Sequence, residues 1–154
     1  PARRTHLPRI LRALPLGGTG QVIRGTCKLT DGSVKIWDAT TGKEEKTLRG
    51  HSDFVPINCL EFSPDGRWLA SGSGLGDGWK IDNTVRIWNI TSGKEYICIG
   101  GRSWAVTGLS FAPGGKRLAV ECGDQVELWD LSKSKSSLFF EERRRDSGRY
   151  GRFL

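Results

Sequence analysis

One pattern recurs along the chain: a short run with alternating apolar residues that ends in tryptophan and leads into a turn. It occurs as DGSVKIWDATTGK (31–43), DNTVRIWNITSGK (82–94) and DQVELWDLSKSK (124–135). The three tryptophans, Trp37, Trp88 and Trp129, lie 51 and 41 residues apart. A repeat of this length is one supersecondary unit, and such units bury their apolar surface only by stacking on neighbours.

The segments between the tryptophans repeat as well. VPINCLEFSPDGRWLAS (55–71) corresponds to VTGLSFAPGGKRLAV (106–120). In both, apolar residues alternate up to a turn that contains proline and glycine, and a second alternating run follows. This pattern is typical of half-buried antiparallel strands joined by hairpins. We therefore predict an all-β chain in which each repeat supplies four short strands.

In their order and spacing, GHSDFV, FSPDGRWLASGS and DNTVRIWN resemble the WD40-repeat family. The resemblance covers residues 22–142 and implies a partial WD40 β-propeller of four-stranded antiparallel blades. The expected units are an incomplete blade (22–49), a blade (50–100) and a blade (101–142). Nothing before residue 22 resembles an inner strand, so we expect about two and a half blades, whereas a closed propeller needs at least four.

In the WD40 family a hydrogen-bond relay often fixes a blade. Its members are a histidine before the first strand, a serine or threonine on the second, an aspartate in the next turn, and the tryptophan. The resemblance assigns these roles to His51, Ser71, Asp82 and Trp88. Ser73 is the less favoured choice for the serine.

The next blade departs from this pattern. Arg102 stands at the histidine position and Val120 at the serine position, although Asp124 and Trp129 are kept. We therefore expect a softer blade that is held by packing.

Family members bind partners through the loops at one rim of the blades. An insertion over residues 74–81 places Trp79 and Lys80 at this rim, and the loop 100–106 adds Arg102 and Trp104. Tryptophan and arginine are enriched at interface hot spots. The alternatives are that Trp79 folds back over the blade edge and that Trp104 fills space within its blade, and for Trp104 we favour packing.

Both termini are basic and lie outside the predicted blades. Residues 1–21 contain no acid, and Leu7, Ile10, Leu11 and Leu14 fit one face of a short helix. This arm is interpreted as disordered, as a docking helix, or as a mitochondrial presequence over residues 1–20. The tail 143–154 combines arginine with aromatic residues, as RNA-contacting segments do. Its candidate contacts are Arg143, Arg144, Arg145, Arg149, Tyr150 and Arg152.

Signals for catalysis and for cofactors are missing from the sequence. The two histidines lie 45 residues apart, and we expect no Ser/His/Asp set. The four cysteines, Cys27, Cys59, Cys98 and Cys122, lack the spacing of a zinc site. We expect no enzyme, no cofactor, no metal and no membrane segment.

The sequence thus predicts a non-catalytic scaffold of WD40 blades that binds other proteins in the cytoplasm or nucleus. The blades would be completed by copies of the chain, by a partner, or by a longer parent propeller. The alternative is a protein associated with nucleic acid, in which the basic arms bind RNA and the blades position them.

Overall fold

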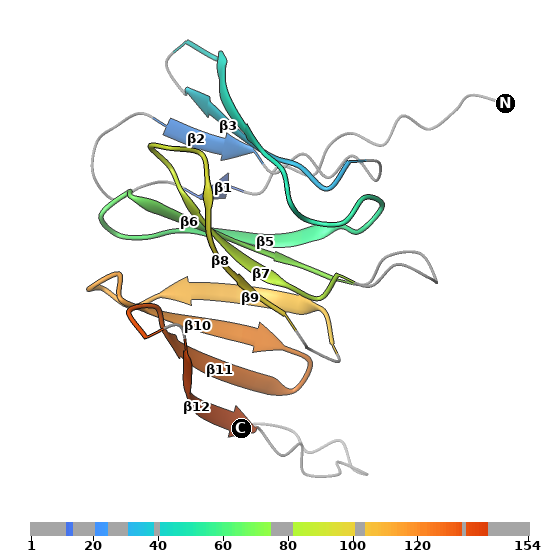
Figure 1. Cartoon of the computed structure of the whole chain (residues 1–154), viewed down its shortest axis with the longest axis vertical. Coiled ribbons are helices and arrows are strands. Elements are labelled where there is room, and N and C mark those ends of the chain that lie inside the picture. The colour runs from blue at the N-terminus through green and yellow to red at the C-terminus, as the bar shows by residue number, and fades with distance from the viewer. Residues whose placement is uncertain are drawn as a thin grey trace, which may run out of the picture.

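The structure is a computed structural model that describes residues 12–13, 21–24, 31–38, 41–74, 82–100, 104–133 and 135–141 (Figure 1). Of residues 12–13, 21–24 and 135–141 it describes the backbone alone. Within these ranges there are twelve strands and no helix. The all-β prediction is confirmed.

The strands share an antiparallel arrangement and run in chain order. They are β1 (Arg12–Ala13), β2 (Gln21–Arg24), β3 (Val34–Asp38), β4 (Glu44–Leu48), β5 (Ile57–Phe62), β6 (Trp68–Ser73), β7 (Val85–Asn89), β8 (Glu95–Ile99), β9 (Val106–Phe111), β10 (Arg117–Cys122), β11 (Gln125–Asp130) and β12 (Lys135–Glu141).

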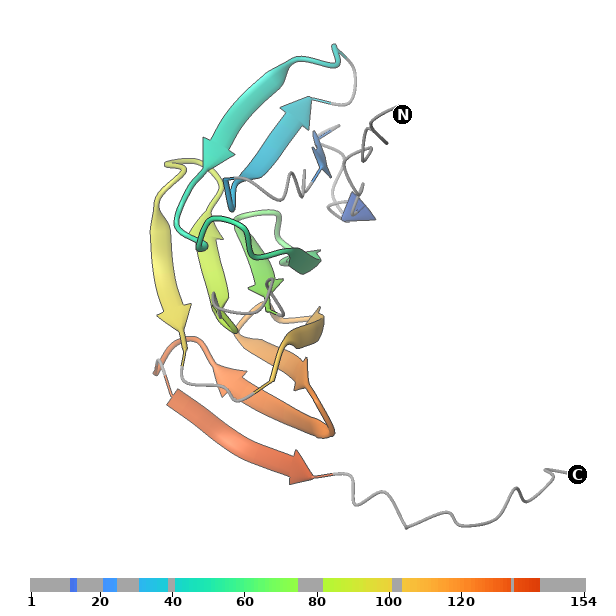
Figure 2. The same cartoon turned by 90° about the vertical axis from the view of Figure 1, so that its right-hand side faces the viewer.

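Three four-stranded sheets result, with the orders β1-β2-β3-β4, β5-β6-β7-β8 and β9-β10-β11-β12, here called blades one, two and three. Figure 2 shows the blades following one another along an arc, with β4, β8 and β12 on its convex side. The inner strands β1, β5 and β9 are neighbours along the arc. Sheets stacked in this way are the expected blades of a partial propeller.

Blade one has a fourth strand that sequence analysis did not find. Arg12 and Ala13 pair with Arg24 and Ile23 of β2. These two residues are therefore extended, and the helix considered for this part of the arm is wrong at this point. A strand of two residues has too few side chains to show an alternation, but it satisfies backbone groups along the inner edge of β2.

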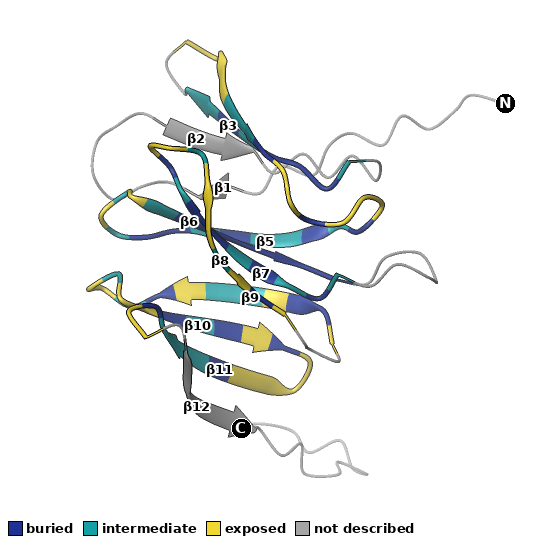
Figure 3. Cartoon of the chain, viewed as in Figure 1, coloured by how far each residue is buried: buried dark blue, intermediate teal, exposed yellow. Residues whose placement is uncertain are grey.

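The core lies between the blades in two layers. Leu69 and Trp88 belong to the layer that joins blade two to blade one, together with Val34 and Ile36. Ala70 and Ile87, on the opposite face of blade two, belong to the layer shared with Leu118 and Val120 of blade three. Blade two is thus buried on both faces (Figure 3).

A polar contact joins blades two and three inside this stack. The Asn58 side-chain amide donates to the carbonyl oxygens of Val106, at 3.1 Å, and Gly74, at 3.3 Å. It therefore connects β5 to β9 and to the start of the insertion. A half-buried amide that bonds two backbone acceptors helps to fix the position of one blade against the next.

The hairpins between the first two strands of blades two and three close through tight turns. Gly66 and Gly115 have φ angles of 69° and 66°. A side chain at either position would strain this left-handed conformation, which explains the glycine in each copy. In blade two Ser63 donates to Asp65 at 2.6 Å, and its backbone N–H bonds to Trp68 at 2.9 Å.

Candidate functional site

The four residues assigned to the relay meet in blade two. His51 Nε2 lies 2.7 Å from Ser71 Oγ, and His51 Nδ1 lies 2.7 Å from Asp82 Oδ2. Trp88 Nε1 donates to Ser71 Oγ at 2.8 Å. We call these four residues the His51 relay. It joins the loop before β5, the strands β6 and β7, and the turn between them.

Further groups bind the Asp82 carboxylate. Ser73 donates to Oδ2 at 2.9 Å, Thr84 donates to Oδ1 at 2.8 Å, and the backbone N–H of Ser52 donates to Oδ2 at 3.1 Å. Both candidate serines are thus used, because Ser71 contacts the histidine and tryptophan while Ser73 contacts the aspartate. Thr84 and Ser52 were missed, although a hydroxyl two residues after an aspartate is a common turn signal.

The surroundings of Asp82 favour its charged form. Burial raises the pKa of this carboxyl, but the hydrogen bonds from His51, Thr84 and Ser73 outweigh burial and hold the pKa well below its usual value. The side chains of His51 and Asp82 are 0% and 4% exposed. The carboxylate is therefore a buried negative charge whose partners are supplied by three separate segments of the blade.

Ser71, His51 and Asp82 are connected in the same order as a serine-hydrolase triad, although they were expected as members of a structural relay and not of a catalytic set. The arrangement lacks access, however. Ser71 is fully buried, and its oxygen already accepts the indole N–H of Trp88. A nucleophile must reach a substrate carbonyl, so this geometry supports a structural role.

Blade three uses a different partner for its tryptophan. Val120 is completely buried at the serine position, and Trp129 Nε1 donates to Glu127 Oε2 at 2.6 Å. The expected packing is therefore supplemented at Trp129 by a hydrogen bond from its indole N–H. Glu127 was missed, although it stands two residues before Trp129 and hence on the same face of β11.

Blade one provides a third arrangement. Trp37 Nε1 is buried and forms no hydrogen bond with the described part of the chain. The ammonium of Lys35 lies 5.8 Å from the centre of its ring. Asp31 accepts a hydrogen bond from the Ser33 hydroxyl at 2.8 Å. The tryptophan positions are thus shared by all three blades, but their polar partners differ.

The described part of the loop rim consists of the loop before β5 and residues 104–105 of the loop before β9. Trp104 is 63% exposed, so the favoured expectation of packing within the blade is wrong. Its indole lies against Gly123, where a Cβ would come within 2.9 Å of the ring, so glycine leaves room for it. Trp79, Lys80 and Arg102 lie outside the described residues.

A second aromatic residue, which the sequence pattern did not indicate, lies at this rim. Phe54 is 49% exposed and has a φ angle of 67°. A bulky residue in this left-handed conformation is an uncommon and strained feature. Its loop lies at the same end of the blades as Trp104, because Gly74 bonds to Pro56 and lies against Ala105. Two exposed aromatic side chains therefore mark the described part of the rim.

The other residues singled out in the sequence are those of the basic tail and the cysteines, and only some of them lie in the described ranges. Arg143, Arg144, Arg145, Arg149, Tyr150 and Arg152 all lie outside the described residues. Of the cysteines, Cys59 is a free thiol. Cys98 is exposed, whereas burial raises the pKa of the Cys59 thiol to about 12. In the described ranges no helix has the length and apolar character needed to cross a membrane.

Comparison with known proteins gives a consistent assignment. Residues 42–89 match the family described as WD domain, G-beta repeat. The chain is 32% identical over 113 residues to periodic tryptophan protein 2 of Arabidopsis thaliana, a match that covers 73% of this chain and 11% of that protein. It is 34% identical over 101 residues to small ribosomal subunit protein RACK1y of Oryza sativa subsp. japonica, covering 66% and 27%.

A third relative is U3 small nucleolar RNA-associated protein 21 of Saccharomyces cerevisiae, 33% identical over 105 residues, with coverage of 66% and 10%. The chain thus spans less than a third of the length of these relatives. The family match lies on blade two and the last strand of blade one, where the tryptophan motif and the His51 relay are found. The chain is a member of the WD40-repeat proteins.

Proposed function

We propose that the chain is a non-catalytic scaffold whose WD40 blades bind other proteins, and that a further blade covers the outer face of blade three. The observation that carries this proposal is a difference in burial between matching positions of two blades. Val85 in β7 and Val126 in β11 each stand three residues before the tryptophan. Val85 is 0% exposed, whereas Val126 is 39% exposed.

The reason for this difference is the neighbour. Val85 and Ile87 face blade three and are buried by it. The same face of blade three presents Val126 and the half-buried Leu128. An apolar blade face of this kind is normally covered in a repeat protein. The covering blade is supplied by a copy of the chain, by another protein, or by a longer parent chain.

The loop rim is the proposed site for a second kind of partner. Phe54 and Trp104 expose aromatic surface there, and Trp79, Lys80 and Arg102 are proposed to contribute to the same surface. Exposed aromatic residues on a scaffold that holds its loops in place are typical of protein-binding sites. The His51 relay would support this rim, because it anchors the loop before β5 to β6 and β7.

The relatives support a scaffold function, and the names of two of them suggest ribonucleoprotein assemblies as the setting. One is named as a protein of the small ribosomal subunit and another as associated with U3 small nucleolar RNA. On this basis we propose a cytoplasmic or nuclear location. The second candidate function, RNA binding by the basic arms, draws on the same names and on the arginines of the tail.

Light scattering after gel filtration, at low and high salt, tests the scaffold proposal. The test variant is Val126→Asp, which places a charge on the outer face of blade three. Lys133→Glu, at the exposed turn after β11, is the control for a charge change on the same blade but off that face. A discrete oligomer that salt leaves unchanged and Val126→Asp dissociates would support coverage by a copy. Association that high salt disperses, with Val126→Asp behaving as the original chain, would contradict an apolar blade contact.

A further inference from the structure

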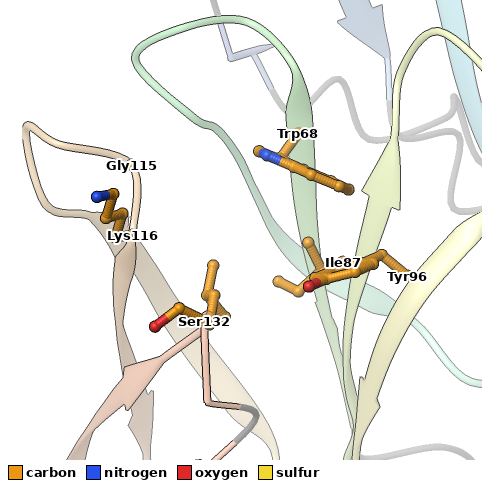
Figure 4. Close-up of a pocket in the computed structure, with 7 residues that line it drawn as sticks. Trp68, Ile87, Tyr96, Gly115, Lys116 and Ser132 are labelled. Atoms are coloured by element: carbon orange, nitrogen blue, oxygen red, sulfur yellow. The ribbon is translucent and has the colours of Figure 1, made fainter.

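A pocket of about 150 Å³ lies between blades two and three, at the end of the strands opposite the loop rim. Trp68, Ile87 and Tyr96 line it from blade two. Blade three contributes Leu131, Ser132 and the turn residues 115–116. In Figure 4 Trp68 and Tyr96 flank the pocket from one side, and Lys116 and Ser132 face them from the other.

The shape of the pocket suits one apolar side chain. The rings of Trp68 and Tyr96 have their centres 4.7 Å apart and are tilted by 38°. Ile87 and Leu131 are buried, whereas Tyr96 is 54% exposed, so an apolar floor opens to solvent past an aromatic wall. A cavity of about this volume holds a molecule of the size of benzene. Phenylalanine or leucine therefore fits the space.

The charged residues around the pocket indicate which residues should flank that apolar side chain in a bound segment. Lys116 is exposed and forms no ion pair with the described residues. The turns at this end also carry Arg67, Lys94, Arg117 and Lys133. The acids of the same turns are engaged locally. Asp65 accepts from Ser63, and Asp130 accepts from Ser132 and lies 3.9 Å from the ammonium of Lys133, so Lys133 is already paired. The pocket thus lies in a basic edge that complements carboxylates.

We propose that this pocket binds an acidic segment of a partner protein, which inserts one phenylalanine or leucine side chain beside Trp68 and Tyr96 and places a carboxylate on Lys116. The geometry favours a peptide over RNA, because the two rings already contact each other and leave no slot for a base between them. This site is separate from the loop rim and from the outer face of blade three, and it stands without them.

The test is fluorescence anisotropy with the full chain and a labelled peptide of glutamate and aspartate around one central phenylalanine. Two matched peptides replace the phenylalanine by serine or the acids by their amides. We expect each replacement to weaken binding about tenfold or more, because each removes one of the two contacts. A single-stranded RNA of similar length is the fourth probe.

Variants of the chain complete the experiment. Lys116→Glu should lower the affinity for the acidic peptide about tenfold or more. Lys43→Glu makes the same charge change at an exposed turn of blade one and should have no effect. Tyr96→Ser should weaken binding through the loss of the aromatic wall. Equal binding of the phenylalanine and serine peptides, no effect of Lys116→Glu, or displacement of the peptide by RNA would each overturn the proposal.

Discussion

Blades two and three have the same strand order but satisfy their tryptophans in different ways. In blade two Trp88 is 1% exposed and is bound by a serine that also contacts His51. In blade three Trp129 is only partly buried, and its indole N–H is bound by Glu127 of the same strand. The hydrogen bonds in blade two connect several segments of the chain, whereas the hydrogen bond in blade three joins two residues of the same strand, β11. The shared tryptophan therefore does not by itself fix a blade.

Truncation of the two tryptophans should give the largest difference in stability loss between the two blades. Trp88→Ala should lower the free energy of unfolding by about 3–5 kcal/mol, because it opens a cavity in a fully buried layer. Trp129→Ala should have a smaller effect, since that side chain is already partly in solvent. Denaturant titration of both variants measures the difference. Equal losses would contradict the idea that blade two is the better fixed blade.

A reciprocal exchange at the serine position should harm both blades. Ser71→Val leaves the Trp88 N–H and His51 buried without their partner, and we expect a loss of about 2–3 kcal/mol in the free energy of unfolding. Val120→Ser places a hydroxyl in an apolar site and should lose about 1–2 kcal/mol. If Val120→Ser stabilised the chain, blade three would contain a hydrogen-bond relay formed by residues outside the described part of the chain.

Acid should act on blade two through Asp82. Its pKa is lowered in the fold, so the unfolded chain takes up the proton more readily. The stabilisation by Asp82 is therefore complete above about pH 4, the ordinary range of this carboxyl, and is lost as the pH falls below it. The stability difference between the original chain and Asp82→Asn should be constant from about pH 6 to about pH 5 and smaller at about pH 3. A difference that does not shrink at the acid end of this range would contradict the assignment.

The smallest effect is expected for Glu127→Gln in blade three. An amide oxygen can still accept the Trp129 N–H, so the loss should be about 1 kcal/mol or less. Glu127→Leu removes the acceptor and should lose more, about 1–3 kcal/mol. Thermal unfolding of the two variants distinguishes them. If Glu127→Leu is as stable as the original chain, the Glu127–Trp129 contact contributes nothing to blade three.

More of the fold than of the side-chain contacts could be predicted from the sequence. Alternation and the turns at Gly66 and Gly115 predicted the strands of blades two and three, because these signals are local. The positions of His51, Ser71, Asp82 and Trp88 followed from the family pattern. Glu127 and the exposure of Trp104 did not, since both depend on which neighbour a side chain meets. A strand as short as Arg12–Ala13 has no side-chain pattern to detect.

The rim and the pocket show the same limit. Phe54 has no sequence signal for its left-handed backbone, because that conformation is imposed by the loop around it. Trp68 and Tyr96 lie 28 residues apart and come together only through the pairing of β6, β7 and β8. Their relation to Lys116 requires in addition that blades two and three stack. Contacts between blades are non-local, so a single repeat cannot reveal them.

The first measurement to make is hydrogen–deuterium exchange of the purified chain, read on peptides of β6–β7 and of β10–β11. This measurement tests whether blade two is the best ordered blade of the stack and whether the outer face of blade three is uncovered in the isolated chain. We expect the amides of β6 and β7 to exchange most slowly and those of β10 and β11 to exchange faster. Equal protection of the two blades, or slower exchange in blade three for the chain as a monomer, would contradict this expectation.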